Sequence, residues 1–148
     1  MPAIQTTYTE NIPTAVVGHV ADMRAAVMAS RECDVAFGFG LPAFQGAKAH
    51  SIKLKVDADT ITTFVGITVR DRSIASGDAY ATNETARVIQ AGPVWVTAAV
   101  QVAAGDPVAV TSAGVWSNVA GTNGLVIDGA RWDTSTTGTG QLAKIALK

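Results

Sequence analysis

The residues of this chain that could support metal binding or nucleophilic catalysis are two histidines and one cysteine. His19 and His50 stand apart, and neither has a Cys, Asp or Glu at the spacing that zinc ligands require. Cys33 has no second cysteine to pair with and no neighbouring histidine that would activate its thiol. We therefore expect no metal site, no internal disulfide and no nucleophile, and we interpret Cys33 as a small core or interface residue.

The glycine-rich stretches and the aspartates are better explained by turns than by catalysis. FGFG (37–40) and GTNG (121–124) lack the strand-to-helix context and the lysine of a phosphate-binding loop. Most aspartates fall in expected turns, where their side chains accept hydrogen bonds from nearby backbone. The aspartates considered are Asp57, Asp59, Asp71, Asp78, Asp106 and Asp128, and most of these six are expected in turns. A catalytic pair of carboxylates is kept as an alternative, although no spacing of the aspartates points to one. We expect a protein that is not an enzyme and carries no cofactor.

The three tryptophans are the remaining candidates for a binding site. Trp95, Trp116 and Trp132 could form a platform on which sugar rings stack, as in a carbohydrate-binding module. Tryptophan is also favoured in hydrophobic cores and at the centre of subunit interfaces. We prefer the core or interface interpretation, which makes this chain a protein that binds a partner rather than one that transforms a substrate.

The charge balance argues against nucleic acid and membrane as partners. The 148 residues include 11 basic and 12 acidic side chains, for a net charge of −1, and no basic stripe is visible. No apolar run approaches the roughly 20 residues of a membrane span, and the N-terminal sequence MPAIQTTYTENIP does not look like a secretory signal. The length suits one domain, and the single cysteine fits assembly in a reducing cytosol.

The first part of the chain combines a polar arm with a segment of helical spacing. Residues 1–14 are rich in threonine and carry two prolines, so we interpret them as an arm. Val16, Val20, Met23 and Val27 then recur at helical spacing, although a glycine interrupts them. Taken alone, this spacing predicts a short helix.

From residue 35 onward, short runs of β-branched residues alternate with turn residues. The alternation in SIKLKV predicts a strand whose two lysines, Lys53 and Lys55, face water. Gly92 and Pro93 are expected to separate two further strands. Strands are expected at residues 35–44, 51–56, 61–71, 86–90, 94–102, 107–112, 125–135 and 142–148. The pattern predicts a mainly β protein, a small antiparallel β-sandwich or barrel domain with an extended N-terminal arm.

A series of short motifs runs in a defined order along these elements. After the polar arm come AVVGHVADM and DVAFGFGLPAFQG, the second of which runs into a small-residue strand. FVGITVRD follows as an F-x-G-I strand, and ARVIQAGPVWVTAAVQVAAGDPVAV joins a W-V strand to a G-D turn. IDGARWDTSTTGTGQLAKIAL ends in an apolar strand. In this order and spacing, from residue 15 onward, the chain resembles the structural cement (capsid decoration) proteins of tailed bacteriophages.

The resemblance implies a partner, a location and a set of contact residues. Such proteins are small β domains that form homotrimers on the outside of an icosahedral capsid and clamp neighbouring major capsid protein subunits. A virion protein on the outer capsid surface, made in the bacterial host cytoplasm, is therefore implied, with an arm over residues 1–24 and a β domain over residues 25–148. Over residues 15–30 the resemblance implies an extended arm and loop in place of the helix. The expected contact residues are Ile4, Tyr8, Ile12, Val16, Met23, Trp95, Trp116 and Trp132.

Two other functions remain open. The segment GLVIDG is similar to a motif of the dUTPase type, a small trimeric β-barrel nucleotide hydrolase. The chain lacks the rest of the ordered Asp, Ser, Arg and Tyr motifs of that family. A glycan-binding head module that uses the three tryptophans is the other alternative, and it is compatible with a place on a capsid.

Overall fold

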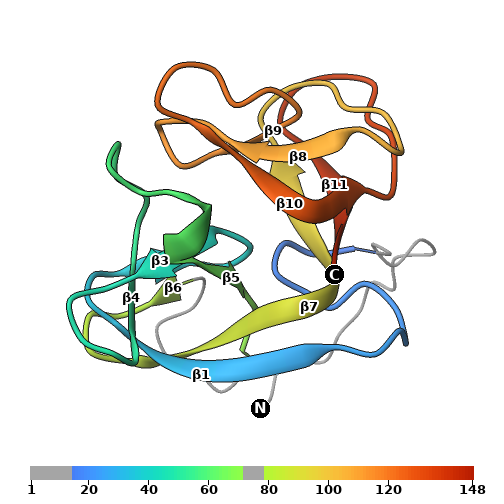
Figure 1. Ribbon diagram of the computed structural model, residues 1–148. Coiled ribbons are helices and arrows are strands. Elements are labelled where there is room, and N and C mark those ends of the chain that lie inside the picture. The colour runs from blue at the N-terminus through green and yellow to red at the C-terminus, as the bar shows by residue number, and fades with distance from the viewer. Residues whose placement is uncertain (1–14, 72–78) are drawn as a thin grey trace, which may run out of the picture.

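The computed structural model describes residues 15–71 and 79–148, and it confirms the expectation of a mainly β fold (Figure 1). The strands are β1 (Val27–Cys33), β2 (Phe37–Gly38), β3 (Pro42–Gln45), β4 (Ser51–Lys53), β5 (Phe64–Thr68), β6 (Ala79–Tyr80), β7 (Thr85–Ala98), β8 (Pro107–Val110), β9 (Trp116–Ser117), β10 (Leu125–Trp132) and β11 (Gln141–Leu147). A single 3-10 turn, η1 (Ile61–Thr63), precedes β5. Within these two ranges, no helix has the length and apolar character that crossing a bilayer requires.

Strand pairing closes the main sheet into two rings that share strand β7. The order of this sheet is β1-β4-β3-β5-β7-β11-β10-β8-β9, and additional pairings join β1 to β7 and β7 to β9. The first ring is therefore β1-β4-β3-β5-β7, and the second ring is β7-β11-β10-β8-β9. Figure 1 shows the second ring above the first, with β7 passing from one into the other. Strands β2 and β6 pair separately.

The continuity of β7 corrects the prediction of two strands separated at Gly92 and Pro93. Residues 85–91 pair with β1, and residues 92–98 pair with β11. Gly92 has a φ of +120°, a conformation that favours glycine, and it lies where the strand passes from the first ring into the second. Pro93 has no N–H to donate, but its carbonyl is paired, because it accepts the N–H of Ala21 in the segment before β1 at 3.0 Å.

Each ring encloses apolar side chains. In the second ring, Trp116 and Trp132 are each 1% exposed and belong to the larger hydrophobic cluster of the protein. The indole N–H of Trp116 donates to the carbonyl of Gly40 at 2.7 Å, and this bond ties the second ring to the first. The smaller cluster, centred on the first ring, comprises Cys33, Phe37, Phe39, Ala43, Ile52, Tyr80, Ala86 and Val88.

The helix predicted from the spacing of residues 16–27 is wrong. The segment before β1 follows the second half of β7 instead, where Val20 and Val94 form an isolated antiparallel bridge. Beside that bridge, the N–H of Trp95 donates to the carbonyl of His19 at 2.9 Å. Pairing with a strand satisfies peptide groups that a helix would otherwise pair internally, so the tertiary contact overrides the helical spacing. The outcome agrees with the loop that the family resemblance implied.

The prediction that Lys55 faces water is also wrong. Strand β4 ends at Lys53, and beyond that residue the chain leaves the sheet, so the alternation no longer applies. Lys55 is only 9% exposed, and its Nζ donates to the carbonyls of Val56 and Asn123. The apolar Leu54 and Val56 are exposed instead. The buried ammonium therefore fastens the β4–β5 loop of the first ring to the second ring.

Candidate functional site

Among the residues that the structure describes, the histidine and cysteine side chains singled out from the sequence are not clustered. Throughout the described ranges, no group of three or more His, Cys, Asp or Glu side chains could hold a metal ion. Cys33 is fully buried, and burial raises the pKa of its thiol to about 11, so the thiolate is scarce at neutral pH. His50 lies at the surface, with its Nε2 3.3 Å from a carboxylate oxygen of Glu32. These groups assemble no reaction centre.

Two of the aspartates expected in turns hold turns in place. Asp106 accepts the N–H of Ala103 at 3.0 Å, and this bond lowers the pKa of the carboxyl group. Burial acts to raise the pKa of Asp59, but hydrogen bonds from Lys53 and from the N–H of Val56 outweigh it and leave that pKa lowered. A general acid at neutral pH needs a raised pKa, so both carboxylates are suited to structural roles.

The tryptophans form no exposed platform. Trp116 and Trp132 are buried, and the indole N–H of Trp132 is used internally by the carbonyl of Ser117 at 3.3 Å. Only Trp95 is half-buried. The core interpretation of Trp116 and Trp132 is confirmed, because closure of the second ring of strands places both indole groups inside it. Within this chain neither indole presents a face on which a sugar could stack, and their expected part in capsid or trimer contacts stays a prediction.

The most exposed large apolar side chain of the described ranges is Met23. Met23 lies at the tip of the turn that precedes β1. Its relative solvent exposure is 102%, so it is fully exposed. Ala25, Ala26 and Val27 follow it and are also exposed, with Val27 at 55%. We call residues 22–27 the Met23 turn. Because neighbouring exposed apolar residues are typical of contact surfaces, this turn is a candidate contact site.

Four charged side chains fix the Met23 turn against the second ring. Nη2 of Arg24 lies 2.7 Å from Asp22 and 2.5 Å from Asp133. Nζ of Lys144 lies 3.3 Å from Asp22 and 3.1 Å from Asp133. Hydrogen bonds from Arg24 are the main reason that the pKa of each aspartate lies below its usual range. Alternating charges of this kind form a network, which orders exposed side chains better than an isolated surface pair.

Strand β1 continues from the Met23 turn, and along part of one of its edges no described residue pairs with it. Strand β7 pairs with β1 from Val27 to Glu32, whereas β4 pairs on the other side only with Glu32 and Cys33. Figure 1 shows β1 along the outer border of the first ring. An open strand edge presents N–H and C=O groups to which an extended segment of a partner can add. The open edge between Val27 and Arg31 therefore extends the surface of the Met23 turn.

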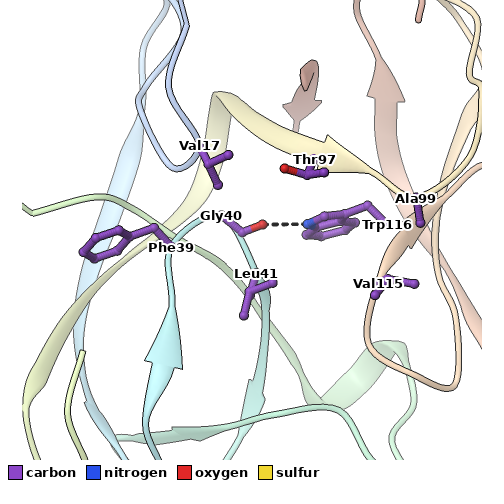
Figure 2. A pocket seen from close by; sticks show the side chains of 8 residues that line it. All are labelled: Val17, Phe39, Gly40, Leu41, Thr97, Ala99, Val115 and Trp116. Carbon is purple, nitrogen blue, oxygen red and sulfur yellow. Dashed lines mark hydrogen bonds between the residues drawn. The ribbon is translucent and has the colours of Figure 1, made fainter. Parts of the chain in front are cut away.

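A third feature is an apolar cavity of about 160 Å³ between the two rings. Figure 2 shows its lining, which comes from four segments far apart in the sequence. The lining residues are Val17, Phe39, Gly40, Leu41, Thr97, Ala99, Val115 and Trp116. The carbonyl of Gly40 and the indole N–H of Trp116 satisfy each other, so the cavity offers an apolar surface and no reactive group.

The contact residues expected from the sequence are thus separated by the fold. Met23 is exposed, Val16 and Trp95 are half-buried, and Trp116 and Trp132 are buried. Ile4, Tyr8 and Ile12 lie outside the described residues. Sequence reasoning missed the open edge of β1 and the cavity, because pairings between distant strands create both.

The comparisons with known proteins indicate the same family as the order of the sequence motifs. The model of the family described as structural cement protein (E217 gp24/Pam3 gp6) matches residues 4–148. A chain of the capsid of Myoviridae phage XM1 has a similar fold, with a TM-score of 0.73 at 19% identity over 99% of this chain and 98% of that one. The N base of head fiber gp8.5 of bacteriophage phi29 gives a TM-score of 0.50 at 14% identity over 84% and 95%.

No curated protein matches the chain. The family match nevertheless extends over nearly the whole sequence, including both rings, the Met23 turn and most of the arm. The chain belongs to the phage structural cement protein family, and its role is that of a structural cement protein of a phage capsid.

Proposed function

We propose that this cement protein forms a homotrimer on the outer surface of the phage head and clamps neighbouring major capsid protein subunits. The arm and loop of residues 1–24, together with the Met23 turn, provide the contact with the capsid. The observation that carries this proposal is the fully exposed Met23, held on a turn that four charges fasten to the second ring.

The side chain of Met23 suits a contact of this kind. Methionine is long, unbranched and polarisable, so it fits irregular apolar surfaces on a partner. Its turn is already ordered by Arg24 and Lys144, so binding need not order it again. A preordered apolar side chain gains the free energy of burial with a small entropic loss.

Trimer formation would multiply such contacts. One turn and one arm give a limited interface, but three linked copies make the second and third contacts effectively intramolecular. Linkage of this type raises avidity by roughly 10²–10⁴. The net charge of −1 supports a position on the outer surface without contact to nucleic acid or membrane.

The test is the occupancy of heads that lack the protein, measured after addition of purified variants. We expect Met23→Gln, which keeps the length of the side chain, to lower affinity at least tenfold (about 1.4 kcal/mol). Val119→Thr is the matched control, because Val119 is 67% exposed but lies away from the Met23 turn on the second ring. Equal affinity of both variants and the wild type would remove Met23 from the interface.

Two further measurements address the arm and the oligomer. Deletion of residues 1–14 is expected to lower head occupancy, and unchanged occupancy would remove the arm from the mechanism. The native mass in solution and on heads is expected to be three times that of one chain. Labelling of intact heads with a reagent that does not cross the shell is expected to modify the protein, as an outer position requires.

We also propose that the protein catalyses no reaction. The buried Cys33 and the structural roles of Asp59 and Asp106 support this proposal over the nucleotide hydrolase alternative. Turnover of dUTP with Mg²⁺ above the rate without protein would contradict it. The burial of Trp116 and Trp132 leaves the glycan-binding alternative without its platform.

A further inference from the structure

The apolar cavity between the rings has the size of a binding site for one side chain. Its volume is about 160 Å³, and it is partly open to the surface. A volume of roughly 150 Å³ is enough to accept a molecule as large as benzene. Trp116 contributes an aromatic wall, and Leu41 and Val115 contribute aliphatic ones, whereas the ring of Phe39 is turned away from the other lining side chains (Figure 2) and packs against Tyr80. The cavity therefore fits a single isoleucine, leucine or aromatic side chain.

The described chain begins at the border of this cavity. Val17 forms part of the wall, and residue 15 is the first residue described. The position of Val17 is fixed, because the next residue, Gly18, donates its N–H to the carbonyl of Trp95 at 2.8 Å. Gly18 also accepts the N–H of Arg70 at 2.8 Å. The preceding residues 1–14 therefore start beside a cavity that would take one apolar side chain.

The sequence of residues 1–14 matches such a cavity. The large apolar residues of this segment after Met1 are Ile4, Tyr8 and Ile12, each four positions from the next and separated mainly by polar residues. In an extended chain, residues separated by an even number of positions point to the same side. The segment would thus present single apolar side chains about 13 Å apart, which suits small separate cavities better than one continuous groove.

We propose that an apolar side chain of the arm (residues 1–14) of a neighbouring copy fills this cavity, so that exchanged arms link the subunits of the trimer. The inference rests on the homotrimer proposed above. The length of the arm permits the exchange, because 14 extended residues span up to about 48 Å. A folded chain of this size has a radius of gyration of only about 15 Å.

The path of the chain favours exchange over insertion into its own cavity. Ile12 is the large arm residue next to the cavity in sequence, and Val16 to His19 already form a turn closed by a 3.1 Å hydrogen bond. For Ile12 to enter the cavity of its own chain, Pro13 and the two residues after it would have to make a second reversal directly before that turn. An arm from another copy would not be subject to this constraint.

Cysteine cross-linking tests the exchange directly. Ile4→Cys, Tyr8→Cys and Ile12→Cys would each be combined with Val115→Cys and oxidised, both free in solution and on heads. The natural Cys33 does not compete, because it is buried and its pKa is raised. We expect at least one arm position to give disulfide-linked dimers and trimers on non-reducing gels. Thr122→Cys, at an exposed loop residue outside the cavity lining, replaces Val115→Cys in the control and should give no such ladder.

A second measurement keeps the inference testable if a cysteine variant misfolds. Ala99→Met would fill the cavity, and we expect it to weaken the trimer at least tenfold in a dilution series followed by native mass. Deletion of residues 1–14 should have an equal effect, and the combined variant should be no weaker than either change alone, because both remove one contact. Ala104→Met, at an exposed alanine outside the cavity lining, should change nothing.

The outcomes separate this inference from the proposed function. A trimer that shows no cross-link between chains, or cross-links only within one chain, overturns arm exchange and leaves the trimeric clamp in place. Additive effects of Ala99→Met and the arm deletion also overturn it. A monomer both in solution and on heads overturns the trimer itself.

Discussion

The second ring and the Met23 turn use large apolar side chains in opposite ways. The second ring places Trp116 and Trp132 inside a closed set of strands, where each is 1% exposed. The Met23 turn leaves its methionine fully exposed and obtains its order from charges instead. The difference means that the residues that stabilise the fold are separate from the exposed Met23. Met23 can therefore be substituted without loss of the apolar interior of the second ring.

The largest expected effect comes from the second ring. Trp132→Ala removes a buried aromatic side chain and leaves a cavity, so we expect the free energy of unfolding to fall by about 3–5 kcal/mol. Urea denaturation followed by circular dichroism measures this change. A loss below about 1 kcal/mol would mean that the ring interior is not the main source of stability.

An intermediate effect is expected where the two rings join. Gly92→Ala places a Cβ 3.0 Å from the Cβ of Ala26 at a φ of +120°, so we expect a loss of about 1–3 kcal/mol. Gly105→Ala is the matched control, since Gly105 has a φ of +94° but no atom within 4 Å of the added Cβ. The difference between the two variants in thermal unfolding isolates the close approach, and equal losses would assign the whole effect to backbone strain.

Acid should release the Met23 turn before it affects the ring interior. The pKa values of Asp22 and Asp133 are lowered in the folded protein, so their charged forms stabilise the turn above the ordinary aspartate pKa of about 3.9. This contribution is lost as the pH falls below about 4 and through the lowered values. We expect the NMR signal of the Met23 methyl group to move towards its unfolded position over this range, while that of Ile145 stays constant.

The combined variant Arg24→Gln and Lys144→Gln serves as the reference for that titration. Its Met23 signal should already lie near the unfolded position at pH 7 and should show a much smaller acid-induced step. An unchanged signal in the variant at pH 7 would show that the charges do not order the turn.

The smallest expected effect is that of Met23→Gln on stability. Because Met23 makes no buried contact, we expect its free energy of unfolding to stay within about 0.5 kcal/mol of the wild type. The same variant is expected to lose head occupancy, as described above. A large loss of stability would instead place Met23 among the residues that maintain the fold.

The β class and most turns could be predicted from the sequence because they depend on local chemistry. Glycine, proline, aspartate and asparagine at strand ends, and the alternation of β-branched residues between them, indicate strands wherever they lie in the fold. The turn at Asp106 is an example, since its carboxylate bonds the N–H of Ala103, three residues away. The order of such turns along the chain was also sufficient to indicate the family.

Features set by distant strands could not be predicted in this way. Trp95 and Trp116 each follow a valine in the sequence, and only the closure of the second ring decides which of the two side chains is inside. The Met23 turn has the spacing of a helix, but its conformation depends on Asp133 and Lys144, more than 100 residues away. Lys55 is buried for the same kind of reason, because its partner carbonyl at Asn123 comes from the other ring.

The sharing of β7 has a mechanical consequence for a structural protein of a phage capsid. A pair of domains joined by a linker would take up the first part of any stretch by straightening the linker. Here a single strand of 14 residues belongs to both rings, with ladders to β1 and β5 at one end and to β11 at the other. A pull across the molecule therefore loads several hydrogen bonds together, along the covalent backbone that connects them. The two rings are therefore connected without a flexible linker between them.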